Sequence, residues 1–137
     1  MPPPEDPIAP EDVQVGRAKS LWASFGYAWA GLLYSLRTQR NFRIHIVAAI
    51  LVIIAGLILS ISILEWAIIA VVIVMVLAAE MANTVVEALV DMVTEKYHPL
   101  AKVAKDVSAG MVLLTAIGAV VVGVLVFFPK LLQVFNR

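Results

Sequence analysis

Cysteine is absent from the 137-residue chain, which excludes disulfides, thiolate metal sites and a cysteine nucleophile. The chain also lacks an excess of either charge, because ten acidic and ten basic residues give a formal net charge of zero. No overall electrostatic attraction to nucleic acid is therefore expected. The glycine-rich nucleotide loops Gly-x-x-x-x-Gly-Lys-Ser/Thr and Gly-x-Gly-x-x-Gly are missing as well. A nucleotide would have to be bound by some other arrangement.

What the chain has in abundance is apolar sequence. Hydrophobic residues make up 62% and charged residues 15%, a composition typical of a membrane protein, and the length suits one domain. Residues 46–64 and 107–129 carry no charge, and the run 66–79 continues in helical pattern to about residue 90. At about 1.5 Å per residue such runs cross the ~30 Å hydrocarbon core. The sequence predicts an all-α membrane fold with spans at about 44–64, 66–90 and 106–129.

The N-terminal region differs from these runs. Residues 1–16 contain five of the seven prolines and four acids, which predicts a disordered tail that is not a secretory signal. Residues 17–38 place their apolar side chains on one helical face with basic residues at both ends, so we expect an amphipathic helix lying on an anionic membrane surface. The apolar face consists of Leu21, Trp22, Phe25, Ala28, Trp29, Leu32, Leu33 and Leu36. We take residues 17–137 as the membrane domain.

Lysine and arginine are placed unevenly along the chain. Eight of the ten lie before the first span or between spans two and three, and two lie near the C-terminus. Since cytoplasmic segments carry the excess of these residues, we expect the N-terminus and residues 91–105 to be cytoplasmic. The eight are Arg17, Lys19, Arg37, Arg40, Arg43, Lys96, Lys102 and Lys105.

Polar side chains form a stripe at the end of the second span. Glu80, Asn83, Glu87 and Asp91 have the spacing i, i+3, i+7, i+11, which places them on one side of a helix. If that span enters from outside at Trp66, Glu80 lies ~21 Å along it, still inside the hydrocarbon core. Glu87 lies ~10 Å further, at the headgroup boundary. An ionisable group at the depth of Glu80 is a functional-site candidate by default.

The stripe suits the transfer of a phosphoryl group to a lipid. A carboxylate surrounded by apolar groups resists ionisation, which suits a base that takes a proton from an alcohol. Glu87 and Asn83 offer the oxygen ligands that Mg²⁺ prefers. Lys105, next to Asp106 at the start of the third span, could neutralise a phosphate tail. A membrane-dissolved alcohol could thus meet a water-borne nucleotide.

Other interpretations remain open at this point. Polar residues in spans also join helices through hydrogen bonds, and His45 and His98 near the cytoplasmic interface fit ordinary structural roles. A second class of function is a small oligomeric proton or cation conductor with Glu80 in its lumen. A third is a non-catalytic assembly partner that keeps the same fold.

The sequence also resembles a known family. The segments E-M-A-N-T-V-V-E-A-L-V-D at 80–91 and Y-H-P-L-A-K-V-A-K-D at 97–106 are similar to the signature of the prokaryotic diacylglycerol kinases, which include undecaprenol kinases. The similarity extends from about Ser24, through R-N-F-R-I-H at 40–45, to F-F-P-K at 127–130. The resemblance implies a homotrimeric kinase of the bacterial inner membrane that uses ATP and Mg²⁺ on diacylglycerol or undecaprenol, with active sites shared between subunits.

By position, the resemblance assigns roles to individual residues. Glu80 corresponds to the catalytic base, Asn83 to a polar partner in the site, and Glu87 to a ligand of metal and nucleotide. The positions implied to contact or lie near the nucleotide are Tyr27, Lys96, Tyr97, His98, Lys105 and Asp106.

One position departs from the family pattern. Gln39 stands where a second metal-binding glutamate is usual, just before R-N-F-R. An amide oxygen can ligate Mg²⁺ but contributes no charge, so we expect either weaker metal binding, substitution by a neighbouring acid, or loss of activity. His45, where Gram-negative members have glutamate, is closer to the undecaprenol kinase branch.

Overall fold

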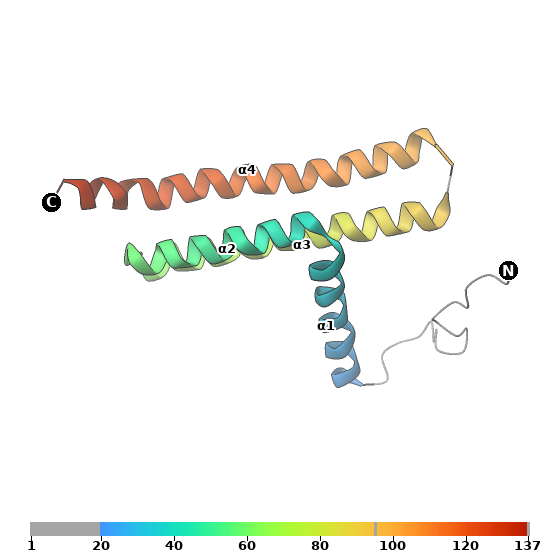
Figure 1. Ribbon diagram of the computed structural model, residues 1–137, viewed down its shortest axis with the longest axis horizontal. Coiled ribbons are helices and arrows are strands. Elements are labelled where there is room, and N and C mark those ends of the chain that lie inside the picture. The colour runs from blue at the N-terminus through green and yellow to red at the C-terminus, as the bar shows by residue number, and fades with distance from the viewer. Residues whose placement is uncertain (1–19, 95, 137) are drawn as a thin grey trace. The chain divides into compact units, whose positions relative to one another are not determined.

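The computed structural model describes residues 20–94 and 96–136, and every regular element among them is an α-helix (Figure 1). The helices are α1 (Leu21–Thr38), α2 (Arg40–Ile58), α3 (Ile63–Val93) and α4 (Pro99–Phe135). The predicted tail 1–16 and the first residues of the predicted surface helix lie outside the described residues. The chain forms two units, the first ending at Leu33 and the second beginning at Tyr34.

The second unit contains three helices that are long and apolar enough to cross a membrane, namely α2, α3 and α4. This confirms the predicted all-helical fold with three spans. A helix satisfies its own backbone hydrogen bonds, which a segment in hydrocarbon requires. With 31 and 37 residues, α3 and α4 reach ~46 and ~55 Å, more than the ~30 Å hydrocarbon core. Both helices are therefore longer than a single crossing requires.

Helices α3 and α4 run side by side, joined by a short connection (Figure 1). The uncharged runs predicted spans 66–90 and 106–129, whereas α3 continues to Val93 and α4 begins at Pro99. The reason at α4 is local. His98 caps its first turn, because its Nδ1 accepts a hydrogen bond of 3.2 Å from the Leu100 N–H, and proline fits the first position of a helix. Most of the expected 91–105 loop is therefore helical.

The opposite end of the second unit is fixed by a capping box at the start of α3. Glu65 Oε2 accepts a hydrogen bond of 2.6 Å from the Ser62 N–H, and Ser62 Oγ accepts one of 3.3 Å from the Glu65 N–H. This arrangement satisfies two backbone donors that a helix start leaves without partners. Glu65 Oε2 also lies 3.4 Å from Lys130 Nζ of α4. The cap of α3 is thus connected to the third span.

A small apolar core lies beside this cap. Ile61, Ile69 and Val126 are buried there, and Trp66 packs against them. The indole of Trp66 lies directly over Gly56 of α2, so that a Cβ at this glycine would come within 2.8 Å of the ring. The absence of a side chain at Gly56 therefore allows α2 and α3 to approach.

The first unit contributes residues 21–33 of α1. Both the apolar residues Trp22 and Phe25 and the polar-side residue Tyr27 are exposed, and the rings of Trp22 and Phe25 lie 6.4 Å apart. An exposed apolar face is what a membrane-surface helix needs, and this role of α1 stays a prediction.

Gly56→Ala should destabilise the second unit. The added methyl group would displace Trp66, and overpacking of this kind costs about 1–3 kcal/mol. We expect a lower melting temperature in detergent, measured by circular dichroism. Gly118→Ala is the matched control, because a Cβ there meets nothing within 4 Å. Equal melting temperatures for the two variants would contradict the tight contact at Gly56.

Candidate active site

Glu80 is the most deeply buried charged side chain among the described residues. It lies on α3 with 2% of its surface exposed, and its Oε2 has no hydrogen-bond partner in the described part of the chain. Burying an unpaired carboxyl group costs several kcal/mol. Among the described residues, no hydrogen bond to Oε2 offsets this cost, so Glu80 is a candidate catalytic group.

One turn further along α3, Asn83 links the stripe to α4. Its Nδ2 donates a hydrogen bond of 3.1 Å to Glu87 Oε1, and its Oδ1 accepts one of 2.7 Å from Ser108 Oγ. Asn83 and Ser108 are buried, while Glu87 is half-buried. The amide therefore joins a buried hydroxyl of one span to a carboxylate that ligands can reach.

The outer part of the stripe consists of ion pairs. Asp91 Oδ1 of α3 lies 2.6 Å from Lys105 Nζ of α4, and Lys102 pairs with Asp106 along α4. The side chains of both pairs are 40–66% exposed. Pairs at such exposure are worth about 0–1 kcal/mol, so the charged groups can exchange partners readily.

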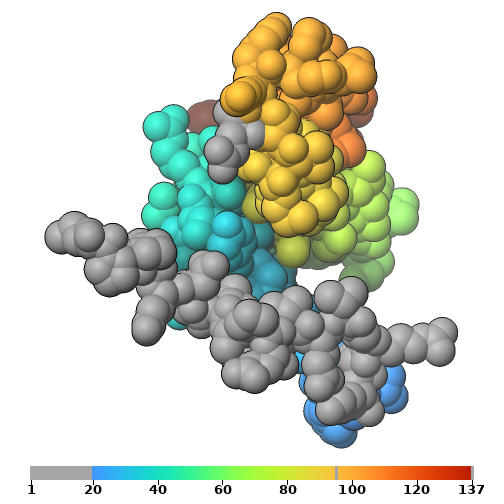
Figure 2. Space-filling model, turned by 90° about the vertical axis from the view of Figure 1, so that its right-hand side faces the viewer, coloured from blue at the N-terminus to red at the C-terminus, as the bar shows by residue number. Residues whose placement is uncertain are grey.

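A pocket of about 460 Å³ opens where α3 passes into α4. Figure 2 looks onto this end of the molecule, with the end of α3 in yellow below the start of α4 in orange. Three lysines and two aspartates give the pocket a mixed, strongly polar lining. Its residues are Val90, Asp91, Thr94, Lys96, Tyr97, His98, Ala101, Lys102, Lys105 and Asp106.

Five of the seven positions expected to bind or lie near a nucleotide thus line one pocket, and Glu87 and Tyr27 are the exceptions. Tyr27 belongs to α1 in the first unit, where it is exposed. Gln39 precedes α2 in the N-cap position, half-buried, and its side chain makes no capping hydrogen bond. Among the described residues, no hydrogen bond joins Gln39 to Glu87.

A second cavity, of about 350 Å³, lies between the three spans. His45 lines it together with small and aliphatic side chains from α2, α3 and α4, including Val76 and Leu77 immediately before the turn that carries Glu80. Apart from His45, the lining of this cavity is apolar.

Ser108 is the site residue that sequence reasoning did not identify. It is the second residue of the uncharged run 107–129, which as a whole is assigned to the predicted third span. The sequence feature that could have indicated Ser108 is its spacing of three residues from Lys105, which places both on one side of α4. In the structure this side faces α3. Asp91 was recognised in the stripe but received no role, and its partner is Lys105.

Comparison with known proteins identifies the family of the chain. Residues 26–127 match the family profile of prokaryotic diacylglycerol kinases. The chain belongs to this family. It is thus a lipid kinase with membrane-spanning helices, and a kinase requires a nucleotide phosphate donor.

Individual relatives carry two different names. The undecaprenol kinase of Bacillus subtilis (strain 168) is 44% identical over 108 residues, 79% of this chain and 88% of the relative. A diacylglycerol kinase of Synechocystis sp. is 46% identical over 117 residues, 85% of this chain and 67% of the relative. The diacylglycerol kinase of Escherichia coli (strain K12) is 30% identical over 96 residues, 70% of this chain and 79% of the relative.

The side chains present fit a magnesium ion that arrives together with a nucleotide. No group of three His, Cys, Asp or Glu among residues 20–94 and 96–136 could hold a metal ion by itself. Mg²⁺ is usually bound through one or two carboxylates, with phosphates and water supplying the other ligands. Glu87 supplies one carboxylate, of which Asn83 occupies only Oε1. The donor set is therefore sufficient for a metal–nucleotide complex.

Proposed function

We propose that residues 17–137 form one membrane domain that phosphorylates a lipid alcohol with ATP and Mg²⁺. The observation that carries this proposal is Glu80, a buried carboxylate with an oxygen lacking a hydrogen-bond partner among the described residues. It lies seven residues from Glu87 on the same helix, or ~10 Å. The acceptor would meet Glu80 from the membrane, and the phosphate donor would approach from the water beside Glu87.

Glu80 acts as the general base in this mechanism. Its Oε2 takes the proton of the acceptor hydroxyl as the alcohol oxygen attacks the γ-phosphorus of ATP. The bond between that phosphorus and the bridging oxygen of the β-phosphate breaks, and ADP leaves. Such proton transfer contributes about 10²- to 10⁴-fold to the rate. The apolar surroundings exclude water, which would otherwise compete as the phosphoryl acceptor.

Glu87, Asn83 and the basic pocket serve the phosphate donor. Glu87 would hold the metal ion, and the ion would supply positive charge against the charge that develops on the transferred phosphoryl group. Lys105 and Asp106, with the segment Lys96–His98, contact the nucleotide from the pocket between α3 and α4. Lys105 changes partner from Asp91 to a phosphate, which costs little because the pair is exposed.

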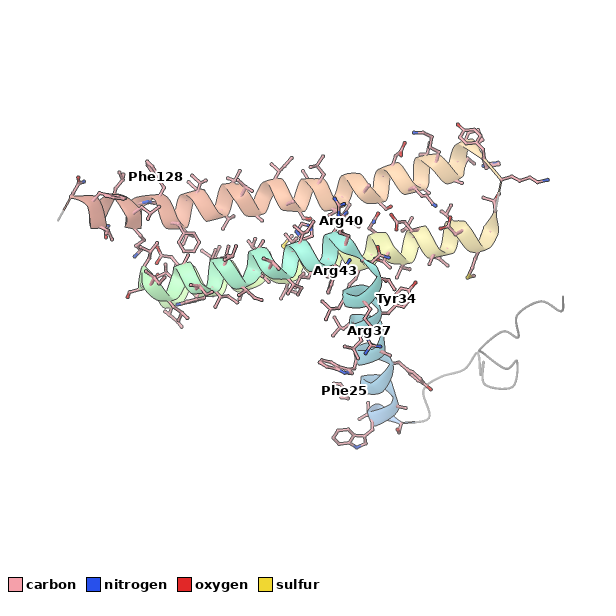
Figure 3. All side chains as sticks on the ribbon, in the orientation of Figure 1. Phe25, Tyr34, Arg37, Arg40, Arg43 and Phe128 are labelled. Atoms are coloured by element: carbon pink, nitrogen blue, oxygen red, sulfur yellow. The ribbon has the colours of Figure 1, made fainter. Side chains whose placement is uncertain are left out.

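We infer that the protein is a homotrimer in the bacterial inner membrane with a cytoplasmic N-terminus. The basic residues at the end of α1 and the start of α2 support this orientation, and Figure 3 labels three of them, Arg37, Arg40 and Arg43. The site then faces the cytoplasm, where ATP is available. A position of Tyr27 near the nucleotide stays a prediction from the family resemblance.

Two acceptors fit the proposal, diacylglycerol and undecaprenol, since relatives bear both names. The apolar cavity between the spans, lined by Val76 and Leu77 about one turn before Glu80 on α3, suits the hydrocarbon chain of either lipid. A proton or cation conductor is not favoured, because conduction of cations does not require a pocket that contains three lysines beside the stripe.

The deciding experiment compares the two lipids side by side. Purified protein is incubated in mixed micelles with radiolabelled ATP, Mg²⁺ and either diacylglycerol or undecaprenol. We expect phosphorylated lipid from at least one of them. A folded trimer that phosphorylates neither would contradict the proposal and favour a non-catalytic assembly partner. Cation flux into liposomes that depends on Glu80 and not on ATP would favour the conductor.

Glu80→Gln should reduce turnover by at least ~10²-fold, because the amide cannot accept the proton. Assembly should be unchanged, since glutamine has nearly the same volume, and gel filtration in detergent will test this. Glu65→Gln is the matched control. Its carboxylate lies on the same helix, ~22 Å away, and pairs with Lys130. Equal turnover in the two variants would remove Glu80 from the role of base.

Gln39→Glu should lower the Mg²⁺ concentration needed for half-maximal activity. A carboxylate adds charge where the wild-type amide has none, and changes around metal ligands commonly alter affinity about tenfold or more. The measurement is a Mg²⁺ titration of turnover at saturating ATP. Gln133→Glu, the same change on the exposed end of α4, is the control. An identical titration for both variants would favour a metal site without position 39.

A further inference from the structure

Ser108 makes a buried polar contact between two spans that the proposed mechanism does not use. Its side chain is 5% exposed, that of Asn83 is 7% exposed, and the two meet at 2.7 Å. The hydroxyl also lies 2.9 Å from the backbone carbonyl of Lys105, one turn back on α4. Ser108 is therefore held between its own helix and the amide of Asn83.

The chemistry of Glu87 fixes which way the amide of Asn83 points. The NH₂ group of Asn83 can only donate, and it donates to Glu87 Oε1, at 3.1 Å. The amide oxygen then faces α4, where it can only accept. The single O–H hydrogen of Ser108 can serve this oxygen, at 2.7 Å, or the Lys105 carbonyl, at 2.9 Å, and the contact with Asn83 is the shorter one. With alanine there, the amide oxygen would be buried without that hydrogen bond, and the amide could turn away from Glu87.

We propose that Ser108 is a positioning residue for Glu87. Its hydroxyl holds the amide of Asn83, and the amide holds Oε1 of the carboxylate, so that the other oxygen is directed to the metal ion. The proposal rests on the proposed function, since it requires Glu87 to bind a metal–nucleotide complex. Outer partners of metal ligands commonly affect metal binding in this way.

A purely structural role predicts a different result. Hydrogen bonds between membrane helices contribute to their association, so loss of the hydroxyl could simply weaken the packing of α3 on α4. Such a role would lower the melting temperature and leave the metal affinity of the folded protein unchanged. Positioning would change the metal affinity, and it would do so only while Asn83 is present.

The test measures metal binding directly, as well as activity. Mn²⁺ is titrated into the detergent-solubilised protein with a non-hydrolysable ATP analogue, and bound Mn²⁺ is followed by electron paramagnetic resonance. We expect Ser108→Ala to raise the Mn²⁺ dissociation constant about fivefold to tenfold, the equivalent of one neutral hydrogen bond. The Mg²⁺ concentration for half-maximal activity should rise equally, while turnover at saturating Mg²⁺ stays close to wild type.

Three further variants separate the explanations. Thr115→Val is the matched control, because the Thr115 hydroxyl bonds only to carbonyls of its own helix, those of Met111 and Val112. Ser108→Cys replaces the hydroxyl by a weak donor of similar size, and should shift Mn²⁺ binding in the same direction if the alanine variant does not fold. In an Asn83→Ala background, Ser108→Ala should have no further effect on Mn²⁺ binding.

The outcomes distinguish this inference from the proposed function. Unchanged Mn²⁺ affinity in the folded Ser108→Ala and Ser108→Cys variants would overturn the positioning role and leave the kinase function intact. A shift in Mn²⁺ affinity in a protein that phosphorylates no lipid would support the positioning role and contradict the function. Wild-type protein that binds no Mn²⁺ with the analogue would overturn both.

Discussion

The constraint on which this structure depends is that a polar group inside a membrane helix needs a partner. Asn83, Thr84 and Ser108 are buried and each makes a hydrogen bond, to a side chain or to a backbone carbonyl. Glu80 differs, because its Oε2 has no partner among the described residues. The exception lies one turn from a satisfied network, so the surrounding polar groups are well placed to bind and orient while Glu80 remains available for a reactant.

The helical period converts this constraint into an ordered site. The spacing of Glu80, Asn83, Glu87 and Asp91 keeps all four on one side of α3 while the depth changes by ~16 Å. Exposure rises along the same line, from buried through half-buried to exposed. The first member is suited to a membrane-dissolved reactant and the last ones to reactants in water. One helix therefore carries polar groups suited to a membrane-dissolved reactant at one point and to a water-borne reactant a few turns further on.

The three spans and the polar stripe of α3 could be predicted from the sequence. The contacts between α3 and α4 could not, for a physical reason. Uncharged runs predicted the three spans, and the helical period of α3 predicted the stripe. Both features depend only on the sequence of a single helix. The contact between Ser108 and Asn83 depends on the rotation and register of α4 against α3, which single-chain periodicity does not determine. The start of α4 at Pro99 depended on the His98 cap, so Lys102 and Lys105 lie on a helix instead of a loop.

The two ends of the site differ in how firmly they are held. Between Ser108, Asn83 and Glu87, exclusion of water makes each hydrogen bond costly to lose, so the amide keeps one orientation. Around Asp91, Lys105 and Asp106, water screens the ion pairs, and exchange of partners costs about 1 kcal/mol or less. Phosphate groups can therefore displace Asp91 from Lys105 without disturbing the buried network. In the proposed mechanism, Glu87 is thus held by a buried network while the charged groups of the pocket are free to exchange partners, and both properties follow from the difference in exposure along α3 and α4.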